Sequence, residues 1–98
     1  MPFRLEFTEP AAETFQDLEK DPGRRGILKA VRKTLGYMES NLRHPSLNTH
    51  KFSSLRGPEG EEVFESYAQN RTPGAFRIFW YYGPGRSVLT VLAIIPHP

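Results

Sequence analysis

The fold is decided in the stretch Gly74-Ala-Phe-Arg-Ile-Phe-Trp-Tyr-Tyr-Gly-Pro-Gly-Arg-Ser-Val-Leu-Thr-Val-Leu-Ala-Ile-Ile-Pro-His97, where the apolar and aromatic residues of the chain are densest. Gly83-Pro84-Gly85 interrupts this stretch. Because glycine accepts positive φ angles and proline presets a bend, the tripeptide predicts a turn between two β-strands. Two polar residues stand out in this hairpin, Arg77 within its first strand and His97 at the exit of its second.

Strict alternation of side chains predicts which residues of the hairpin share a face. One face of the first strand is formed by Phe76, Ile78, Trp80 and Tyr82, and the other by Arg77, Phe79 and Tyr81. The second strand is apolar on both faces, which are Val88, Leu92 and Ile94 on one side and Leu89, Val91, Ala93 and Ile95 on the other. This pattern is typical of a central strand that is covered on both sides.

The first half of the chain predicts one short strand and two helices. Residues 3–7 alternate and indicate a strand, and Thr8 is suited to cap a helix that runs to about Lys20. Asp21 and Pro22 then predict the start of a second helix. Its apolar stripe steps by three and four residues and comprises Ile27, Leu28, Val31, Leu35, Met38 and Leu42.

Residues 41–60 form a connector rich in proline and glycine, within which residues 50–56 indicate a short edge strand. Residues 61–69 predict a further strand, and residues 70–74 a turn into the hairpin. The order favours an α+β fold. We expect an N-terminal strand and an antiparallel helix hairpin packed on one face of a twisted, mainly antiparallel sheet of four to five strands, with the first strand beside the last.

The length of 98 residues predicts a single domain, residues 1–98. The absence of cysteine excludes disulfides and thiolate metal sites, and no apolar run approaches the ~20 residues that a membrane helix needs. The first residues lack the apolar core of a signal peptide, because Glu6 and Glu9 interrupt it. We therefore expect a cytoplasmic protein without contact to a membrane.

Charge is unevenly distributed along the chain, although the net charge is only +2. Residues 24–56 contain eight basic residues and one acidic residue, a balance of 8 − 1 = +7, and acidic segments flank them. Such a basic segment indicates a surface for a polyanion or for an acidic protein. A solvated helix face with no partner explains the same pattern.

Arg77 and His97 are the first candidates for chemistry. A buried guanidinium needs a partner, so Arg77 either pairs with Glu65 on the neighbouring strand or is held by the sheet to bind a phosphate. His97 is either a proton donor and acceptor or an exposed residue without a role. On the face of Arg77, the ring of Tyr81 either stacks on bases or packs in the core.

Known signatures of other chemistries are absent from the sequence. There is no glycine-rich phosphate loop, and the three histidines have no metal-like spacing, so we expect neither a metal nor a cofactor. Cleavage of RNA needs little machinery, because the 2′-hydroxyl itself attacks the adjacent phosphate. If the connector folds back over the edge of the sheet, His50, Lys51 and Arg56 approach Arg77.

Several ordered features together resemble the RelE/ParE superfamily of type II toxin–antitoxin systems, and within it the RelE- and HigB-like messenger-RNA interferases. They are the segment His44-Pro-Ser-Leu-Asn-Thr-His-Lys51, the strand Val63-Phe-Glu-Ser-Tyr67, the strand Ala75-Phe-Arg-Ile-Phe-Trp80 and the terminal His97. The resemblance covers essentially the whole chain. It implies a toxin that cleaves mRNA on the ribosome, inhibits translation and is silenced by a cognate antitoxin.

The resemblance also assigns residues. Arg77 matches the strand arginine that contacts the scissile phosphate, and His97 matches the residue after the last strand that works as acid or base. His50 matches a further catalytic group, and Glu65 a strand glutamate that orients Arg77. The residues that we expect to bind RNA are Lys51, Arg56, Arg43, Tyr81, Lys29, Arg32 and Lys33. The implied partners are the antitoxin, the ribosome and mRNA, with the free toxin a monomer and the silenced toxin a hetero-oligomer.

The resemblance leaves two alternatives open. Many members have an aromatic residue directly after the terminal histidine, where this sequence has Pro98. A weakened toxin that retains only antitoxin binding is therefore one alternative. The other is a gyrase inhibitor like the ParE members, which share the fold without the nuclease residues.

Overall fold

A single five-stranded sheet organises the chain, with strand order β1-β5-β4-β3-β2. A computed structural model describes residues 2–97. Its elements are β1 (Arg4–Phe7), α1 (Glu9–Lys20), α2 (Arg25–Ser40), β2 (His50–Arg56), β3 (Glu62–Tyr67), β4 (Phe76–Tyr82) and β5 (Val88–Pro96), with short 3-10 turns at Pro22–Arg24 and Pro45–Leu47. β1 pairs parallel with β5, and every other pair of neighbours is antiparallel.

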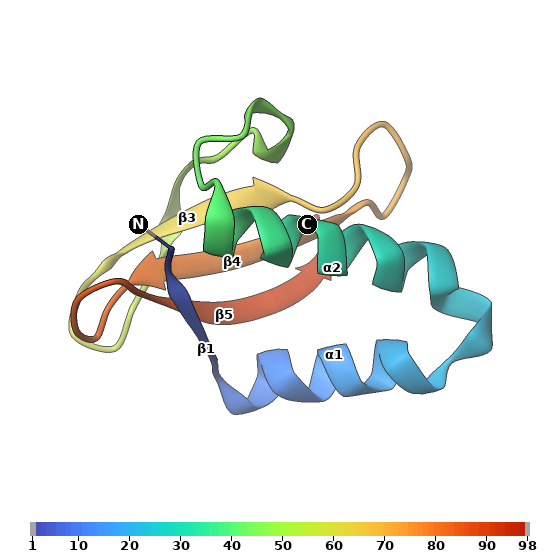
Figure 1. Ribbon diagram of the computed structural model, residues 1–98, viewed down its shortest axis with the longest axis horizontal. Helices are drawn as coiled ribbons and strands as arrows, with labels where there is room; N and C mark the ends of the chain where they lie inside the picture. The colour runs from blue at the N-terminus through green and yellow to red at the C-terminus, as the bar shows by residue number, and fades with distance from the viewer. Residues whose placement is uncertain (1, 98) are drawn as a thin grey trace.

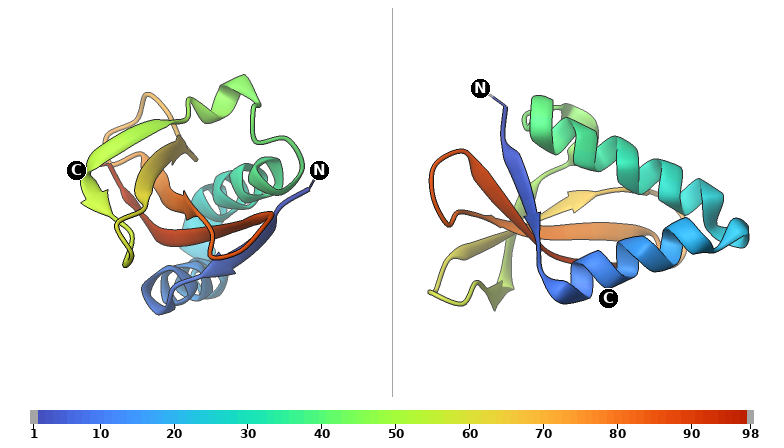
Figure 2. Two further views of the ribbon diagram at one scale, coloured as in Figure 1. Left: turned by 90° about the vertical axis from the view of Figure 1, so that its left-hand side faces the viewer. Right: turned by 60° about the horizontal axis from the view of Figure 1, so that its bottom comes forward.

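The two helices cover one face of this sheet (Figure 1). Turning the molecule shows α1 and α2 side by side on that face, while the hairpin of β2 and β3 twists away from them (Figure 2). The expected α+β architecture is therefore confirmed, including the place of β1 beside the last strand. Neither helix of residues 2–97 is long and apolar enough to cross a membrane.

The helices start and end largely where local sequence signals predict, and two of the predictions are wrong. Thr8 caps α1 as predicted, since its hydroxyl oxygen accepts a hydrogen bond from the backbone N–H of Ala11. Asp21 caps the 3-10 turn Pro22–Arg24 and not α2 itself, because that turn precedes the helix. Leu42 belongs to the predicted stripe but lies beyond the end of α2 at Ser40, where it still packs against the core.

The main core lies between the helices and the sheet. Val31, Leu35 and Met38 of α2 pack there with Ile78 and Trp80 of β4. Ile78, Trp80, Val31 and Met38 are fully buried. This arrangement confirms the apolar stripe of the second helix and the apolar face of β4. It leaves Arg77 and Phe79 on the opposite face of the sheet, which no helix covers.

A β-bulge in β5 breaks the predicted alternation of the last strand. Trp80 pairs with Val91 and Phe79 pairs with Ala93, so that Leu92 is the extra residue. Beyond the bulge the faces are exchanged, and Ile94 joins the helix-covered core although alternation assigns it to the other side. Ile95 lies opposite Arg77, and the backbone N–H of His97 donates to Ala75 O at 2.8 Å. The bulge thereby places His97 on the face of Arg77.

The face without helices is covered in part by the sheet itself. β2 forms the predicted edge strand, and its register against β3 shifts between Lys51 and Arg56. The ring of Phe52 packs edge-on against Phe79, with ring centroids 4.8 Å apart. This contact helps to explain why Phe79 is buried on a face that has no helix. The uncovered end of the same face carries the polar cluster described next.

Candidate functional site

Glu65 is the centre of a polar cluster on the helix-free face of the sheet. It lies in the middle of β3, where His50 of β2 is its partner on one side and Phe79 of β4 on the other. Its side chain is only 1% exposed, yet both carboxylate oxygens have partners. A buried carboxylate is stable only when such partners replace water. Three cationic or titratable side chains converge on it: His50, Arg77 and His97.

His50 contacts one carboxylate oxygen. Its Nε2 lies 2.7 Å from Oε1 of Glu65, and its Nδ1 lies 2.8 Å from the backbone carbonyl oxygen of Asn48. The position of that carbonyl depends on the chain reversal before β2, where Asn48 has a left-handed φ of 46°. The Tyr67 ring packs against the imidazole in a T-shaped arrangement with centroids 5.9 Å apart. Both ring nitrogens of His50 are thus engaged by oxygen atoms of the protein.

His97 contacts the other carboxylate oxygen. Its Nδ1 lies 2.8 Å from Oε2 of Glu65. The side chain is 47% exposed, and Nε2 has no hydrogen-bond partner among the described residues. Because a carboxylate accepts, Nδ1 carries a proton and Nε2 faces outward. A histidine that is oriented in this way by a carboxylate can accept or donate a proton at Nε2.

Arg77 lies between Glu65 and the ring of Tyr67. Its Nε is 3.6 Å from Oε2 of Glu65, close enough for an ion pair but too long for a hydrogen bond. The guanidinium carbon lies 3.7 Å from the centroid of the Tyr67 ring, and Nη1 donates to the backbone carbonyl oxygen of Gln69. Arg77 is 7% exposed, and its Nε is buried without a hydrogen-bond partner. The ion pair between Arg77 and Glu65 is therefore present. It was one of the two interpretations of Arg77 from the sequence.

The arrangement combines a fixed cation with an outward-facing imidazole. Glu65 contributes one negative charge, which the guanidinium of Arg77 offsets, and the two histidines add positive charge whenever they are protonated. Such a site attracts an anion and can exchange a proton with it. Within residues 2–97, no group of three or more His, Cys, Asp or Glu residues has a geometry able to hold a metal ion.

The residues predicted to bind RNA are spread over several surfaces. Lys51 points away from the cluster and pairs with Glu62 at 3.4 Å, and Arg56 lies at the far end of β2. Arg43 lies in the loop after α2. Lys33 of α2 lines a hollow of about 380 Å³ together with Tyr67, whose ring contacts Arg77. These basic residues form no continuous track with Arg77.

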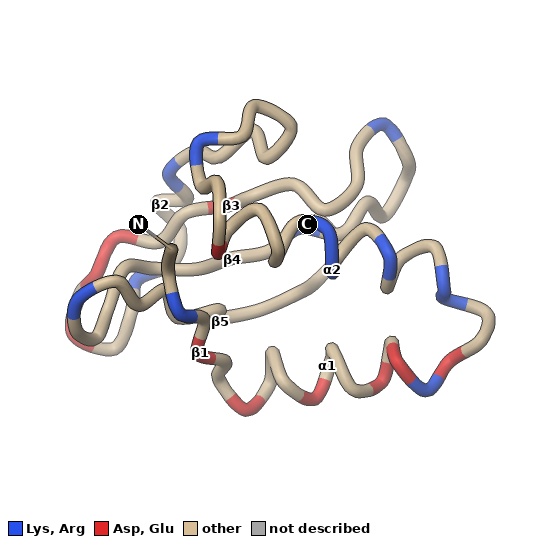
Figure 3. Tube along the Cα trace, in the orientation of Figure 1, with Lys and Arg blue, Asp and Glu red and all other residues tan. Residues whose placement is uncertain are grey.

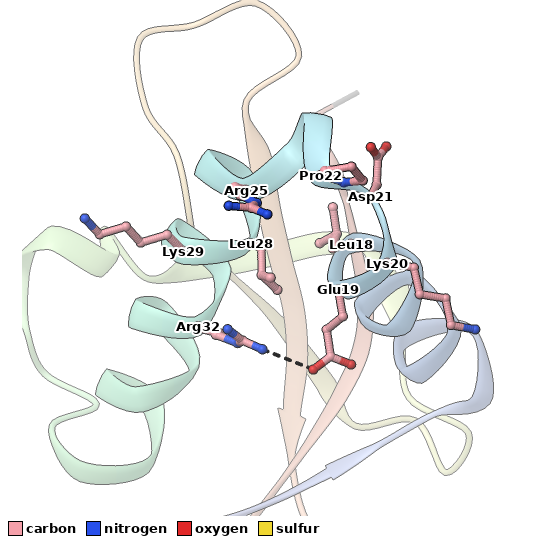
Figure 4. Close-up of a pocket in the computed structure, with 9 residues that line it drawn as sticks. All are labelled: Leu18, Glu19, Lys20, Asp21, Pro22, Arg25, Leu28, Lys29 and Arg32. Atoms are coloured by element: carbon pink, nitrogen blue, oxygen red, sulfur yellow. Dashed lines mark hydrogen bonds and ion pairs between the residues drawn. The ribbon is translucent and has the colours of Figure 1, made fainter.

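Lys29 and Arg32 lie elsewhere, in a groove of about 510 Å³ between α1 and α2 (Figure 4). Leu18 and Leu28 also line this groove, and an ion pair of 3.1 Å between Arg32 and Glu19 bridges the two helices. The groove is on the helix side of the molecule, so it is separate from the Glu65 cluster on the opposite face of the sheet.

Tyr81 requires a correction. It shares the face of Arg77 as predicted, but it is only 5% exposed. Its ring packs within the sheet and is not available to stack on a base. Tyr67, at the end of β3, is half-buried instead, and its ring lies against the guanidinium of Arg77. The sequence indicated that Tyr67 lies near the cluster, since it is two residues from Glu65 and shares its face of the strand.

Comparisons with known proteins bear on the fold. No family model matches the chain, and no curated protein matches it in sequence. Several solved structures are similar in fold, among them the following three. A RelE–RelB complex from Pyrococcus horikoshii has 12% identity and a TM-score of 0.66, covering 98% of this chain and 96% of that chain. A YoeB/ParE toxin from Agrobacterium tumefaciens has 9% identity and a TM-score of 0.69, covering 98% and 100%. A YoeB–YefM complex from Staphylococcus aureus has 11% identity and a TM-score of 0.67, covering 100% of both chains.

These similarities span the whole fold and not one motif. The chain therefore has the fold of the RelE and YoeB toxins, and the resemblance that its sequence suggests is confirmed at the level of the fold. At identities of 9% to 12% the roles of individual residues do not transfer by alignment, so they have to be argued from the cluster itself.

Proposed function

We propose that this chain is the toxin of a toxin–antitoxin pair and acts as a metal-independent endoribonuclease on mRNA bound to the ribosome. The observation that carries the proposal is the Glu65 cluster, in which a nearly buried Arg77 and an outward-facing His97 share one carboxylate. The fold supports it, because similar solved chains are named as RelE and YoeB toxins. Inhibition of translation in the cytoplasm follows from that activity.

RNA cleavage requires only proton exchange and stabilisation of negative charge from the cluster. The 2′-oxygen of a ribose attacks the adjacent phosphorus, the bond from phosphorus to the 5′-oxygen breaks, and a 2′,3′-cyclic phosphate remains. One proton leaves the 2′-oxygen and one reaches the 5′-oxygen, and Nε2 of His97 is the group placed to exchange them. Nη2 of Arg77 donates to no described residue and is the part of the guanidinium available to a phosphate oxygen. Charge on the phosphate rises in the transition state, where a fixed cation is most effective.

The test is primer-extension mapping of cleavage on translating ribosomes, with free RNA as a second substrate. We compare wild type with His97→Ala and Arg77→Ala, and use His44→Ala as the matched histidine control, since His44 lies outside the cluster and stacks on Tyr37. Cleavage by wild type and by the control, lost in both cluster variants, is the expected result. A folded wild type that cuts neither substrate would contradict the proposal, and inhibition of DNA gyrase would then be assayed.

The partner that we propose is an antitoxin with an acidic segment. Two of the similar solved chains are bound to RelB or YefM. Here the groove between α1 and α2 presents Arg25, Lys29 and Arg32 beside apolar Leu18 and Leu28 (Figure 4). A segment with carboxylates and a few apolar side chains complements this lining. Expression without an antitoxin should arrest growth of a host cell, and Arg77→Ala should relieve the arrest; arrest by both would argue against cleavage as its cause.

A further inference from the structure

We infer that His50 is a positioning residue held as an imidazolium, and that Nε2 of His97 is the single imidazole nitrogen of the cluster that exchanges a proton with the substrate. The inference deepens the proposed ribonuclease function and rests on it for the identity of the substrate. Sequence reasoning placed both histidines among the catalytic groups. The hydrogen bonds around each ring separate their roles.

The first step is a count of protons on His50. A backbone carbonyl only accepts, so the contact of 2.8 Å between Nδ1 and Asn48 O requires a proton on Nδ1. A neutral ring with that proton has a lone pair on Nε2. That lone pair would face Oε1 of Glu65 at 2.7 Å, a distance at which two acceptors repel each other. One proton must therefore lie between Nε2 and Oε1.

The second step places this proton on the imidazole. Oε2 of Glu65 already accepts from Nδ1 of His97 and lies 3.6 Å from the guanidinium of Arg77. The ion pair with Arg77 is made by the ionised carboxylate. His50 then carries both ring protons and its positive charge is fixed by two acceptors. Neither nitrogen has a lone pair or a direction left for a substrate, so His50 cannot act as the acid or base.

The third step concerns what His50 does for its neighbours. By binding Oε1 it holds the Glu65 carboxylate in one rotamer, and the same carboxylate fixes the Nδ1–H tautomer of His97. Nε2 of His97 is then the basic nitrogen and is turned outward. Glu65 is likewise a positioning residue, because His50 and His97 occupy its two oxygens. With Arg77 and His50 positive and Glu65 negative, the site keeps a net positive charge for a phosphate when His97 is neutral.

The test begins with the free protein, so it does not depend on cleavage. Long-range ¹H–¹⁵N NMR spectra of the imidazoles report which nitrogens carry protons. We expect two protonated nitrogens in His50 and, in the neutral ring of His97, the Nδ1–H tautomer. His44 is an internal reference, because its Nδ1 accepts from the N–H of Ser46 at 3.1 Å and the neutral ring must carry its proton on Nε2. A single protonated nitrogen in His50 would overturn the inference.

Cleavage kinetics then distinguish a positioning role of His50 from a role in proton transfer. Cleavage rates per folded molecule are compared for His50→Gln, His50→Ala and His97→Gln. The glutamine amide can still donate to Glu65, so His50→Gln should retain more activity than His50→Ala and lose less than the ~100-fold that marks a lost acid or base. His97→Gln should lose about 100-fold or more. Equal losses in His50→Gln and His97→Gln would overturn the positioning role, as would wild-type rates per folded molecule in His50→Ala.

Failure of the proposed function gives a different pattern. If wild type cleaves no RNA, the ribonuclease proposal fails, while the NMR spectra still decide the protonation of His50 and His97. If wild type cleaves RNA and His50 is neutral, the ribonuclease proposal is supported, and the assignment of different roles to His50 and His97 is wrong.

Discussion

At the scale of single residues, Glu65 links the stability of the molecule to its proposed chemistry. Its carboxylate is 1% exposed and contacts His50, His97 and Arg77. Removing one member of a buried charged group leaves the others without compensation, which costs more than the pair contributes when intact. The effect should be largest for Arg77, because its buried Nε has no hydrogen bond even in the native cluster.

We therefore expect Glu65→Ala to destabilise the protein by about 3–5 kcal/mol, because the guanidinium of Arg77 stays buried with no carboxylate beside it. Urea denaturation at neutral pH measures the change. The double variant Glu65→Ala with Arg77→Met should recover part of the loss, since it removes the uncompensated cation as well. Glu62→Ala is the matched control, because Glu62 is exposed and its ion pair with Lys51 should contribute about 1 kcal/mol or less. A cost for Glu65→Ala as small as that of Glu62→Ala would contradict this view of the cluster.

Sequence reasoning named all four members of this cluster, Glu65 included, but not the contacts of the two histidines with Glu65. The pairing of Arg77 with Glu65 was predictable, because a buried guanidinium in a strand needs a carboxylate on the neighbouring strand. The two contacts from His50 and His97 to Glu65 were not. They depend on the register of β2, which shifts along its length, and on the bulge in β5. Neither irregularity leaves a signal in the alternation of side chains.

At the scale of secondary-structure elements, the bulge at Leu92 is the feature that connects the helices with the site. The hydroxyl of Thr8 donates to the carbonyl oxygen of Leu92 at 2.8 Å and also accepts from the N–H of Ala11 at 3.3 Å. One side chain therefore caps α1 and satisfies the carbonyl group of the extra residue in β5. Thr8 was predictable as a cap from its position before the helix. Its contact with the Leu92 carbonyl was not, because the two residues are 84 positions apart in the sequence and the contact depends on the bulge in β5.

Thr8→Ala should consequently cost about 1–2 kcal/mol, the upper part of the range for a lost N-cap, because it removes both hydrogen bonds. Thr8→Ser retains the hydroxyl and should cost distinctly less. Thermal and urea unfolding of both variants measure the difference. Thr14→Ala serves as a control within the same helix, since the Thr14 hydroxyl only donates to Pro10 O on the exposed side. If Thr8→Ala and Thr14→Ala proved equally mild, the dual role of Thr8 would be wrong.

At the scale of the whole molecule, the two helices differ in charge. The sequence of α1 contains four acidic residues and Lys20, whereas α2 contains Arg25, Lys29, Arg32 and Lys33 with one acidic residue. Figure 3 shows acidic positions along α1 and basic positions along α2. α2 therefore carries four of the eight basic residues of the segment 24–56. Its residues divide, however, between the groove of Figure 4 and the hollow that Lys33 shares with Tyr67.

This division predicts which cations an RNA strand meets on its way to the cluster. Lys33 lines the hollow beside Tyr67, whose ring contacts Arg77, while Lys20 lines the groove between the helices. Each phosphate neutralised on a single strand contributes about −0.7 to the slope of log affinity against log salt concentration. Lys33→Gln should therefore flatten that slope by about 0.7, and Lys20→Gln should leave it unchanged. Fluorescence anisotropy with a short labelled RNA in the cleavage-deficient His97→Gln background measures both slopes. Equal flattening by the two variants would mean that RNA attraction is diffuse, and that the hollow beside Tyr67 is not its route to Arg77.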